Sequence, residues 1–213
     1  NNGRLFPLSL ASEGSCQIGG NLATNAGGLN VIKYGNVRDL CLGLEAVLPC
    51  GQIVSTMKPL KKNNMGFDLK NLLIGSEGTL GIITSTILKT FPIPKDPISI
   101  FLSINNLANV LFVFEKISRE FSERILAFEL IKMTSIDFIE ETGFTIKNPF
   151  NKKTNWKVLI EIDVNIGRIN LGEIIENTFY DLLLENKIVE VFFATNINQR
   201  NEFWKIRELI PAA

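Results

Sequence analysis

The chain contains no histidine, and this absence excludes several kinds of chemistry within its 213 residues. A serine or cysteine nucleophile has no histidine to activate it, and imidazole is missing as a general base and as a metal ligand. The balance of 22 basic and 22 acidic side chains also lacks the excess positive charge typical of nucleic-acid binding. We therefore expect no nucleic-acid partner and no metal site formed by these residues.

Long apolar runs and paired cysteines are also missing. The longest apolar stretches have the length of strands, far below the roughly 20 residues that cross a bilayer, so no transmembrane segment is expected. Cys16, Cys41 and Cys50 are odd in number and scattered, which favours a reducing compartment over a disulfide framework. No signal peptide is recognisable. We expect the bacterial cytoplasm or, in a eukaryote, the mitochondrial matrix.

Glycine and phenylalanine are distributed unequally along the chain. Of 16 glycines, 13 precede Phe91, whereas 12 of 15 phenylalanines follow it. Glycine permits tight backbone geometry and phenylalanine fills cores, so two different architectures are joined. Three prolines between Pro92 and Pro97 interrupt regular structure. We expect residues 1–91 and 98–213 to be separate domains, with residues 92–97 as a stiff connector.

Apolar spacing after the connector alternates between the strand period and the helical period. It predicts strands at Ile98–Ile104, Ile125–Ile131, Lys157–Val164 and Val189–Ala194. It predicts helices at Leu107–Phe121, Thr134–Glu141, Leu171–Leu184 and Gln199–Leu209. Strands that alternate with helices in this way indicate an α+β domain whose sheet is covered by helices on one face.

The first part of the chain has a weaker periodic signal. Glycines and asparagines interrupt Ser15–Gly35 every few residues. Strand candidates lie within four segments: Val31–Tyr34, Leu40–Leu48, Gln52–Ser55 and Leu80–Thr90.

The densest motif is Gly14–Gly28, in which two Gly-Gly pairs are interleaved with Ser, Cys, Asn and Thr. Glycines let a ligand approach backbone N–H groups, and the short polar side chains offer uncharged hydrogen-bonding groups. The spacing matches neither G-x-G-x-x-G nor a Walker A loop. From these residues alone, a ligand cradle and a glycine-rich turn without a ligand both stay open.

A second glycine-rich motif is Gly75–Thr84, which follows an amphipathic turn at Leu69, Leu72 and Leu73. Its glycines at positions 75, 78 and 81 keep one side of the bend free of side chains. Taken alone, a glycine-rich turn before a strand is weak evidence for a ligand.

Together, these motifs resemble the FAD-linked oxidoreductases of the vanillyl-alcohol oxidase type. The resemblance includes Tyr34-Gly35 and Leu44–Leu48, and it continues through Ala127–Glu129 to Trp204–Glu208. It is greatest to the D-2-hydroxyglutarate dehydrogenases, with D-lactate dehydrogenases and the glycolate oxidase flavin subunit as relatives. Pro211 departs from the threonine usual in the first of these branches, so 2-hydroxyglutarate and lactate both stay open as substrates.

The resemblance implies a fold and a set of FAD contacts. Residues 1–91 would be the C-terminal part of an FAD-binding domain, and residues 98–213 a ferredoxin-like cap domain with an antiparallel sheet and helices on one face. The implied contacts to the flavin, ribityl and pyrophosphate groups are Ser15, Cys16, Ile18, Gly19, Gly20, Asn21, Thr24, Asn25, Gly28, Tyr34 and Gly35. Those to the adenosine half are Glu77, Gly78, Gly81, Ile82 and Ile83.

The resemblance also implies an activity, namely oxidation of a D-2-hydroxy acid to the 2-oxo acid. The α-hydrogen would pass as hydride to flavin N5, a base would take the hydroxyl proton, and a separate acceptor would reoxidise the flavin. Arg207 would bind the substrate carboxylate, which suits the planar guanidinium. A solvated arginine paired with Glu202 or Glu208 is the alternative. Glu129 is as well explained by a structural ion pair as by catalysis.

The resemblance makes the chain an internal fragment. The family's pyrophosphate loop precedes its match, and the histidines that bind a divalent metal and the substrate follow it. We therefore expect no catalytic or metal-binding residue within the chain, and no activity from it in isolation. An inert remnant of a split reading frame is the alternative, associating at most with a complementary fragment. A homo-oligomer is a further possible assembly.

Overall fold

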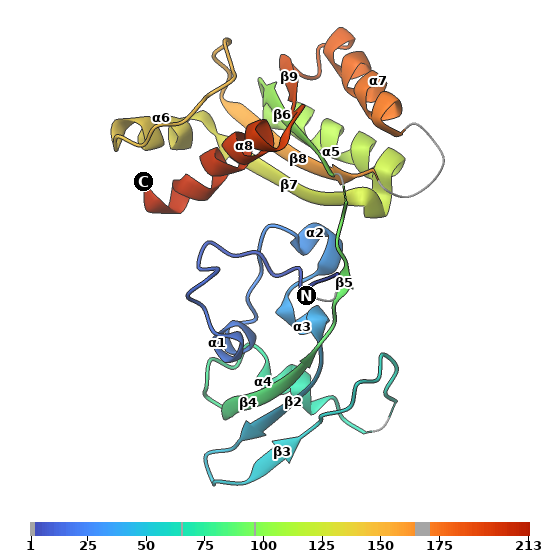
Figure 1. Cartoon of the computed structure of the whole chain (residues 1–213), viewed down its shortest axis with the longest axis vertical. Coiled ribbons are helices and arrows are strands. Elements are labelled where there is room, and N and C mark those ends of the chain that lie inside the picture. Colours follow the sequence, from blue (N-terminus) through green and yellow to red (C-terminus); the bar gives the residue numbers. More distant parts are fainter. Residues whose placement is uncertain (1–2, 65, 96, 165–170) are drawn as a thin grey trace. The chain divides into compact units, whose positions relative to one another are not determined.

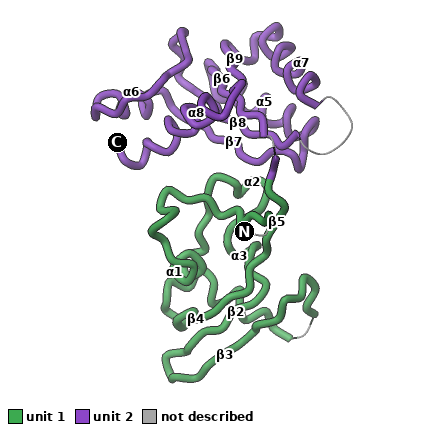
Figure 2. The backbone as a smooth tube through the Cα atoms, in the orientation of Figure 1, with its two compact units in different colours: residues 1–93 green, residues 94–213 purple. Residues whose placement is uncertain are grey.

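The computed structural model describes residues 3–64, 66–95, 97–164 and 171–213. The chain divides into two compact units, unit 1 (Asn1–Ile93) and unit 2 (Pro94–Ala213), shown in Figure 2. Asp96, part of the expected connector, lies outside the described residues. The flanking prolines belong to regular structure, because Pro92 pairs with Arg4 and Pro97 begins a strand of unit 2. Within the expected connector, residues 93–95 are described and lie outside the strands.

Unit 1 is built on a three-stranded antiparallel sheet in the order β3-β2-β4. Its strands are β2 (Cys41–Val47), β3 (Ile53–Ser55) and β4 (Ile82–Leu88). A second, two-stranded sheet pairs β1 (Arg4–Leu5) with β5 (Phe91–Pro92). Four short helices complete the unit: α1 (Ile18–Ala23), α2 (Val31–Tyr34), α3 (Val37–Leu40) and α4 (Leu69–Leu73).

The core of unit 1 is small and collects side chains from nearly every element. Leu22 of α1, Leu40 of α3, Leu44 of β2 and Leu73 of α4 are all buried within it. The prediction of a strand at Val31–Tyr34 is wrong, because these residues form α2. Gly35 ends this single turn at φ 75°, a backbone conformation that glycine adopts without strain. Four residues are too few for a helical period to be visible in the sequence.

Unit 2 contains a four-stranded antiparallel sheet in the order β7-β8-β6-β9. The strands are β6 (Pro97–Ile104), β7 (Ile125–Lys132), β8 (Trp156–Asp163) and β9 (Glu190–Phe193). The helices are α5 (Leu107–Phe121), α6 (Met133–Glu141), α7 (Leu171–Leu184) and α8 (Ile197–Leu209), and two 3-10 turns are η1 (Ser122–Arg124) and η2 (Ile210–Ala212). This strand order, with α5 and α7 as crossovers, is the expected ferredoxin-like arrangement.

Helices pack on both faces of this sheet (Figure 1), which extends the expectation of helices on one face. On one face, Ile100, Val158 and Ile160 pack with Ile117 of α5 and Phe179 of α7. The opposite face has its own buried cluster, composed of Phe101, Ile131, Ile136, Ile139, Leu159, Phe203 and Ile206. α6 and α8 supply the helical members of this second cluster. The extra layer forms because alternate residues of β6 and β8 are apolar on both faces.

Candidate functional site

The two glycine motifs meet in unit 1. The backbone N–H of Gly75 donates to the carbonyl of Leu22 at 3.0 Å, and that of Glu77 donates to the carbonyl of Ala23 at 2.9 Å. α1 also packs against β4, which lies beside it in Figure 1. A Cβ placed on Gly19 would contact the carbonyl oxygen of Ile83 at 3.4 Å. Segments more than 50 residues apart in the sequence thus form one surface.

The first motif presents uncharged polar groups on this surface. Ser15, Cys16 and Thr24 are exposed, and Ile18 is the exposed first residue of α1. The half-buried Asn21 side chain donates to the sulfur of Cys16 at 3.4 Å. No charged side chain occurs between Gly14 and Asn30. The surface therefore offers hydrogen-bonding groups to a ligand without a fixed charge.

Two glycines of the first motif, Gly14 and Gly20, lie beside open space. Apart from its chain neighbours and, at Gly20, its own helix backbone, a Cβ placed on Gly14 or Gly20 would have no described atom within 4 Å. Gly20 lies within α1 and is exposed, so a ligand can approach its backbone directly. These residues fit a large polar cofactor that is held by close approach to the main chain.

The second motif bends through left-handed backbone conformations. Glu77 has φ 51° and Gly78 has φ 80°. Left-handed geometry is uncommon for a non-glycine residue, and such outliers cluster at binding sites. After the bend, the Ile82 side chain is 64% exposed and Ile83 is partly buried. The geometry leaves both the backbone of the bend and an apolar side chain accessible.

Other predicted contact residues have a packing role in the fold itself. A Cβ on Gly28 would lie 1.8 Å from the carbonyl oxygen of Ser9, and one on Gly81 would lie 2.7 Å from that of Val47. Both glycines are therefore required by neighbouring backbone, whether or not they also contact a ligand. The Tyr34 ring packs against Phe91, with centroids 4.6 Å apart.

Gly35 and Asn25 also have partners within the unit. A Cβ on Gly35 would lie 2.3 Å from a carboxylate oxygen of Asp39. The Asn25 side-chain oxygen accepts from the backbone N–H of Arg38 at 3.2 Å. These contacts order the segment between α1 and β2, and they leave open whether either residue also touches a ligand.

Arg207, the predicted carboxylate-binding residue, lies on α8 of unit 2. Its Nε donates to Oε2 of Glu129 on β7 at 2.5 Å. The two side chains are 28% and 20% exposed. Of the two alternative partners, Glu202 pairs with Lys147, and among the described residues the ion pair given for Arg207 is the one to Glu129. Sequence reasoning named both Arg207 and Glu129 but did not connect them.

A buried polar cluster around Glu161 was missed by sequence reasoning. The carboxylate of this β8 residue accepts from Arg200 Nε at 2.7 Å, from Arg200 Nη2 at 3.1 Å, from Trp204 Nε1 at 3.0 Å and from Ser99 Oγ at 2.8 Å. The hydrogen bond to Glu161 is the main reason that the pKa of Arg200 lies above its ordinary value. A sequence signal existed, because Glu161 interrupts the apolar run between Val158 and Ile162.

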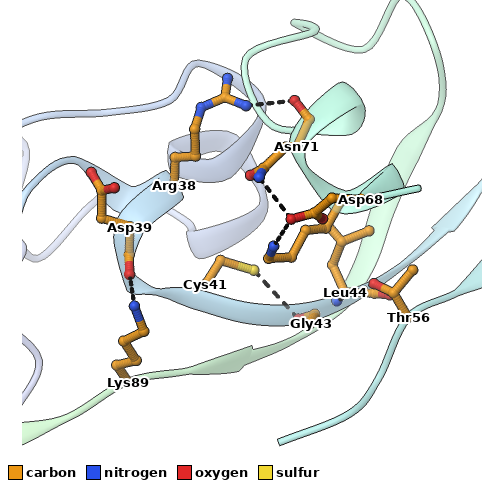
Figure 3. Close-up of polar contacts among 10 residues, drawn as sticks. Arg38, Asp39, Cys41, Gly43, Leu44, Thr56, Asp68, Asn71 and Lys89 are labelled. Atoms are coloured by element: carbon orange, nitrogen blue, oxygen red, sulfur yellow. Dashed lines mark hydrogen bonds and ion pairs between the residues drawn. The ribbon is translucent and has the colours of Figure 1, made fainter. Parts of the chain in front are cut away.

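Unit 1 also contains a hollow of about 410 Å³ next to the start of β2. Three of its basic lining side chains are bonded to the protein, and Figure 3 shows the contacts of Arg38 and Lys89. Arg38 donates to the carbonyls of Asn71 and Ile74, Lys89 donates to the carbonyl of Asp39, and Lys70 pairs with Asp68. These contacts tie α3, α4 and β4 together. These side chains of the lining therefore take part in contacts that stabilise unit 1 itself.

Metal binding and membrane insertion receive no support from the described residues. Within residues 3–64, 66–95, 97–164 and 171–213, no group of three Cys, Asp or Glu side chains is placed to hold a metal ion. In the same part of the chain, no helix has the length and apolar surface that a bilayer crossing requires. The cysteines Cys16, Cys41 and Cys50 form no disulfide.

Comparison with known protein families shows to which family the chain belongs. Residues 1–57 match the family described as "FAD binding domain". Residues 93–213, more than half of the chain, match "FAD linked oxidases, C-terminal domain". The chain belongs to the FAD-linked oxidase family. FAD is the cofactor of this family, and both matches agree with the resemblance inferred from the glycine motifs.

Individual members of the FAD-linked oxidase family are similar along almost the whole chain. D-2-hydroxyglutarate dehydrogenase of Arabidopsis thaliana is 36% identical over 99% of the chain. D-2-hydroxyglutarate–pyruvate transhydrogenase of Saccharomyces cerevisiae is 36% identical over 98%. A putative D-lactate dehydrogenase of Schizosaccharomyces pombe is 36% identical over 97%. The chain spans 38%, 42% and 39% of these relatives, respectively.

A solved structure supports the fold. Alkyldihydroxyacetonephosphate synthase matches 97% of the chain with a TM-score of 0.65, and the match covers 40% of that protein. At 21% sequence identity, this likeness concerns the fold alone. Together with the family matches, it agrees with an α+β arrangement of an FAD-binding part and a cap-like part.

Proposed function

We propose that this chain supplies part of the FAD site and the substrate cap of an enzyme that oxidises a D-2-hydroxy acid to the 2-oxo acid. The similarity to D-2-hydroxyglutarate dehydrogenases, at 36% identity over 99% of the chain, carries this proposal. The substrate would be 2-hydroxyglutarate or lactate, and a separate acceptor would take the electrons. A reducing compartment, either the mitochondrial matrix or the bacterial cytoplasm, suits three unpaired cysteines.

In the proposed cofactor site, the first motif and the bend at Glu77-Gly78 contact FAD. When bound, FAD supplies the hydride acceptor of the reaction. The exposed hydroxyl of Ser15 and the accessible backbone at Gly20 would hydrogen-bond the cofactor, and Ile82 would cover an apolar edge. The accessible backbone of Gly20 is the feature of this site that a side chain would block.

In the proposed substrate site, Arg207 holds the carboxylate of the hydroxy acid. A guanidinium binds a carboxylate through two parallel N–H groups, which fixes the orientation of the substrate as well as its position. Such positioning fixes where the α-carbon of the acid lies relative to Arg207. Arg207 therefore contributes substrate orientation, and no residue of the chain is assigned to proton transfer.

FAD binding by the purified chain tests the cofactor part of the proposal. Titration with FAD should quench flavin fluorescence and shift the visible absorbance of the flavin. Gly20→Val should weaken this binding by about tenfold or more, because its side chain occupies the open approach to the backbone. Ala108→Val, which adds bulk to an exposed position of α5, is the matched control. Equal FAD affinity for Gly20→Val and for the control would contradict the proposed cofactor site.

The substrate part is tested by acid binding, because no activity is expected from the chain in isolation. D-2-hydroxyglutarate and D-lactate are added to the FAD-loaded protein, and binding is followed by tryptophan fluorescence, since Trp204 lies on α8 with Arg207. We expect Arg207→Ala to reduce the affinity for the bound acid by about tenfold or more, since a charged hydrogen-bonding partner is lost. Unchanged affinity in Arg207→Ala would remove Arg207 from the substrate site.

A further inference from the structure

The two arginines of α8 that contact the sheet differ in how many of their N–H groups are used. Arg200 and Arg207 are seven residues apart, so both face the sheet. Arg200 contacts Glu161 through both Nε and Nη2. Arg207 contacts Glu129 through Nε alone. Within the described parts of the chain, no hydrogen bond from the terminal Nη groups of Arg207 is recorded.

The position of Glu129 in the sheet places its carboxylate on the face that α8 covers. Glu129 lies opposite Leu159 in the β7–β8 register, and Leu159 packs in the cluster that α8 covers. Residues paired across antiparallel strands share a face of the sheet, so Glu129 projects toward α8. The contact uses Nε, the guanidinium nitrogen joined to the side-chain stem. The far end of the guanidinium, formed by Nη1 and Nη2, has two parallel N–H groups of the kind that bind a carboxylate.

We propose that Glu129 is a positioning residue, which holds Arg207 by its Nε so that the terminal Nη groups can bind the substrate carboxylate. This inference rests on the proposed function, because it assigns Glu129 to the site that Arg207 forms. Glu129 itself touches no substrate. Its role is to remove the rotational freedom of a long side chain before the substrate arrives, which reduces the entropy lost on binding.

The direction in which carboxylate affinity changes when Glu129 is replaced distinguishes two roles for this residue. The negative charge of Glu129 opposes the binding of a second carboxylate at Arg207, and it competes for the same guanidinium. If Glu129 merely neutralised Arg207, its removal would strengthen carboxylate binding. If Glu129 positions Arg207, removal of its hydrogen-bond acceptor weakens binding although a repulsive charge is lost. Glutamine keeps an acceptor oxygen without the charge, so Glu129→Gln separates the two effects.

The experiment measures the affinity of the FAD-loaded protein for glutarate, a dicarboxylate without the oxidisable hydroxyl group. Tryptophan fluorescence reports binding, because Trp204 lies one turn from Arg207 on α8. We expect Glu129→Ala to weaken binding by about tenfold, the loss typical of a charge-assisted hydrogen bond. Glu129→Gln should stay within about threefold of the wild type, since it keeps the acceptor. Glu202→Gln, which alters an exposed ion pair on the same helix, is the control.

A second measurement observes the orientation of Arg207 directly. In protein labelled with ¹⁵N-arginine, the Nε–H resonance of Arg207 should be assigned by its loss in Arg207→Lys. It should move in Glu129→Ala and be largely retained in Glu129→Gln, whereas the resonance of Arg200 should be unchanged in both. Thermal unfolding of each variant separates local effects from loss of fold.

The outcomes distinguish this inference from the proposed function. Tighter glutarate binding by Glu129→Ala, or an unchanged Arg207 resonance, would overturn the positioning role while leaving Arg207 as the binding residue. Wild-type affinity in Arg207→Ala, or no glutarate binding by the wild type, would overturn both the carboxylate site and the role of Glu129. Weakened binding in Glu129→Ala, retained binding in Glu129→Gln and a displaced Arg207 resonance support the positioning role.

Discussion

Unit 1 and unit 2 achieve close packing in different ways. In unit 1, backbone approaches backbone at glycines: Gly28 meets the carbonyl of Ser9, and Gly43 meets that of Thr56. In unit 2, phenylalanine rings fill the space between helices and sheet. Phe101 packs against Phe150 and Phe203, with centroids 4.7 and 5.4 Å away.

This difference has a consequence for substitution. A side chain packed in a core can be replaced at a cost that grows with the volume removed, because the neighbours relax only in part. A glycine pressed against a carbonyl accepts no side chain at all unless the backbone moves. Unit 2 should therefore respond gradually to changes of size, and unit 1 should respond abruptly to any added atom.

The largest effect is expected where unit 2 loses a buried ring. Phe101→Ala should lower the free energy of unfolding by about 4 kcal/mol, because the Phe101 side chain is 0% exposed and contacts two other rings. Phe101→Leu should cost clearly less, as a gradual response to volume requires. Chemical denaturation followed by tryptophan fluorescence is suitable, because both tryptophans lie in unit 2.

The control for this change is Phe138→Ala on α6, whose ring is 60% exposed. It should change the free energy of unfolding by less than about 0.5 kcal/mol. Equal costs for Phe101→Leu and Phe101→Ala would break the comparison, because unit 2 would then respond as abruptly as unit 1.

The next effect is expected in unit 1. Gly28→Ala should destabilise this unit by about 3 kcal/mol, because the added Cβ would lie 1.8 Å from the carbonyl oxygen of Ser9. The same carbonyl accepts the backbone N–H of Leu29 at 3.0 Å, so its displacement would also disturb a hydrogen bond. Circular dichroism should detect the loss while the tryptophan fluorescence of unit 2 is retained.

Gly20→Ala provides the matched control for Gly28→Ala. A Cβ on Gly20 would meet no atom outside its own helical turn within 4 Å, and Gly20 lies within α1, so alanine should be neutral or slightly stabilising there. If Gly28→Ala proved as stable as Gly20→Ala, backbone contact would not be what holds unit 1 together.

The smallest effect concerns pH and a buried lysine of unit 2. The Lys157 side chain is 0% exposed, donates to Thr154 Oγ1 at 2.7 Å and lies over the Phe150 ring. Burial lowers the pKa of Lys157, and the charge of Glu190 acts in the opposite direction. Between this lowered pKa and the ordinary value, the unfolded chain binds more protons, so the stability contribution of Lys157 rises with pH.

Lys157→Met should abolish this alkaline rise. Thermal unfolding midpoints measured from about pH 8 to about pH 11 should rise relative to those of Lys157→Met as the pH increases. Lys153→Met, at an exposed position, should follow the wild type. A constant difference between wild type and Lys157→Met across this range would show that burial of the charge has no influence on stability.

The two units also differ in how well their secondary structure could be predicted from the sequence. In unit 2 the helices Leu107–Phe121 and Leu171–Leu184 have the predicted ends, because long amphipathic segments carry several repeats of their period. In unit 1 α1 was missed and α2 was predicted as a strand. Elements of four to six residues contain at most two turns, so tertiary contacts rather than periodicity determine them.

The candidate site shows a similar division. The glycine motifs identified the family, but sequence reasoning could not separate glycines that face open space from those pressed against backbone. Gly20 and Gly28 occur in the same motif, yet a Cβ would find open space at Gly20 and the carbonyl oxygen of Ser9 at Gly28. Likewise, the pairing of Arg207 with Glu129 joins residues 78 positions apart. Such contacts depend on the sheet order, which local patterns do not contain.

The buried carboxylate of Glu161 has an effect beyond its own hydrogen bonds. It contacts α8 at Arg200 and at Trp204, four residues apart, and it also accepts from Ser99 on β6. Sliding α8 along its axis, or turning it, would break the contacts at both helical positions together. Glu161 thus fixes the position of α8 along and around its axis relative to the sheet. Because Arg207 lies on the same helix, Glu161 also fixes where the guanidinium of Arg207 lies over the sheet.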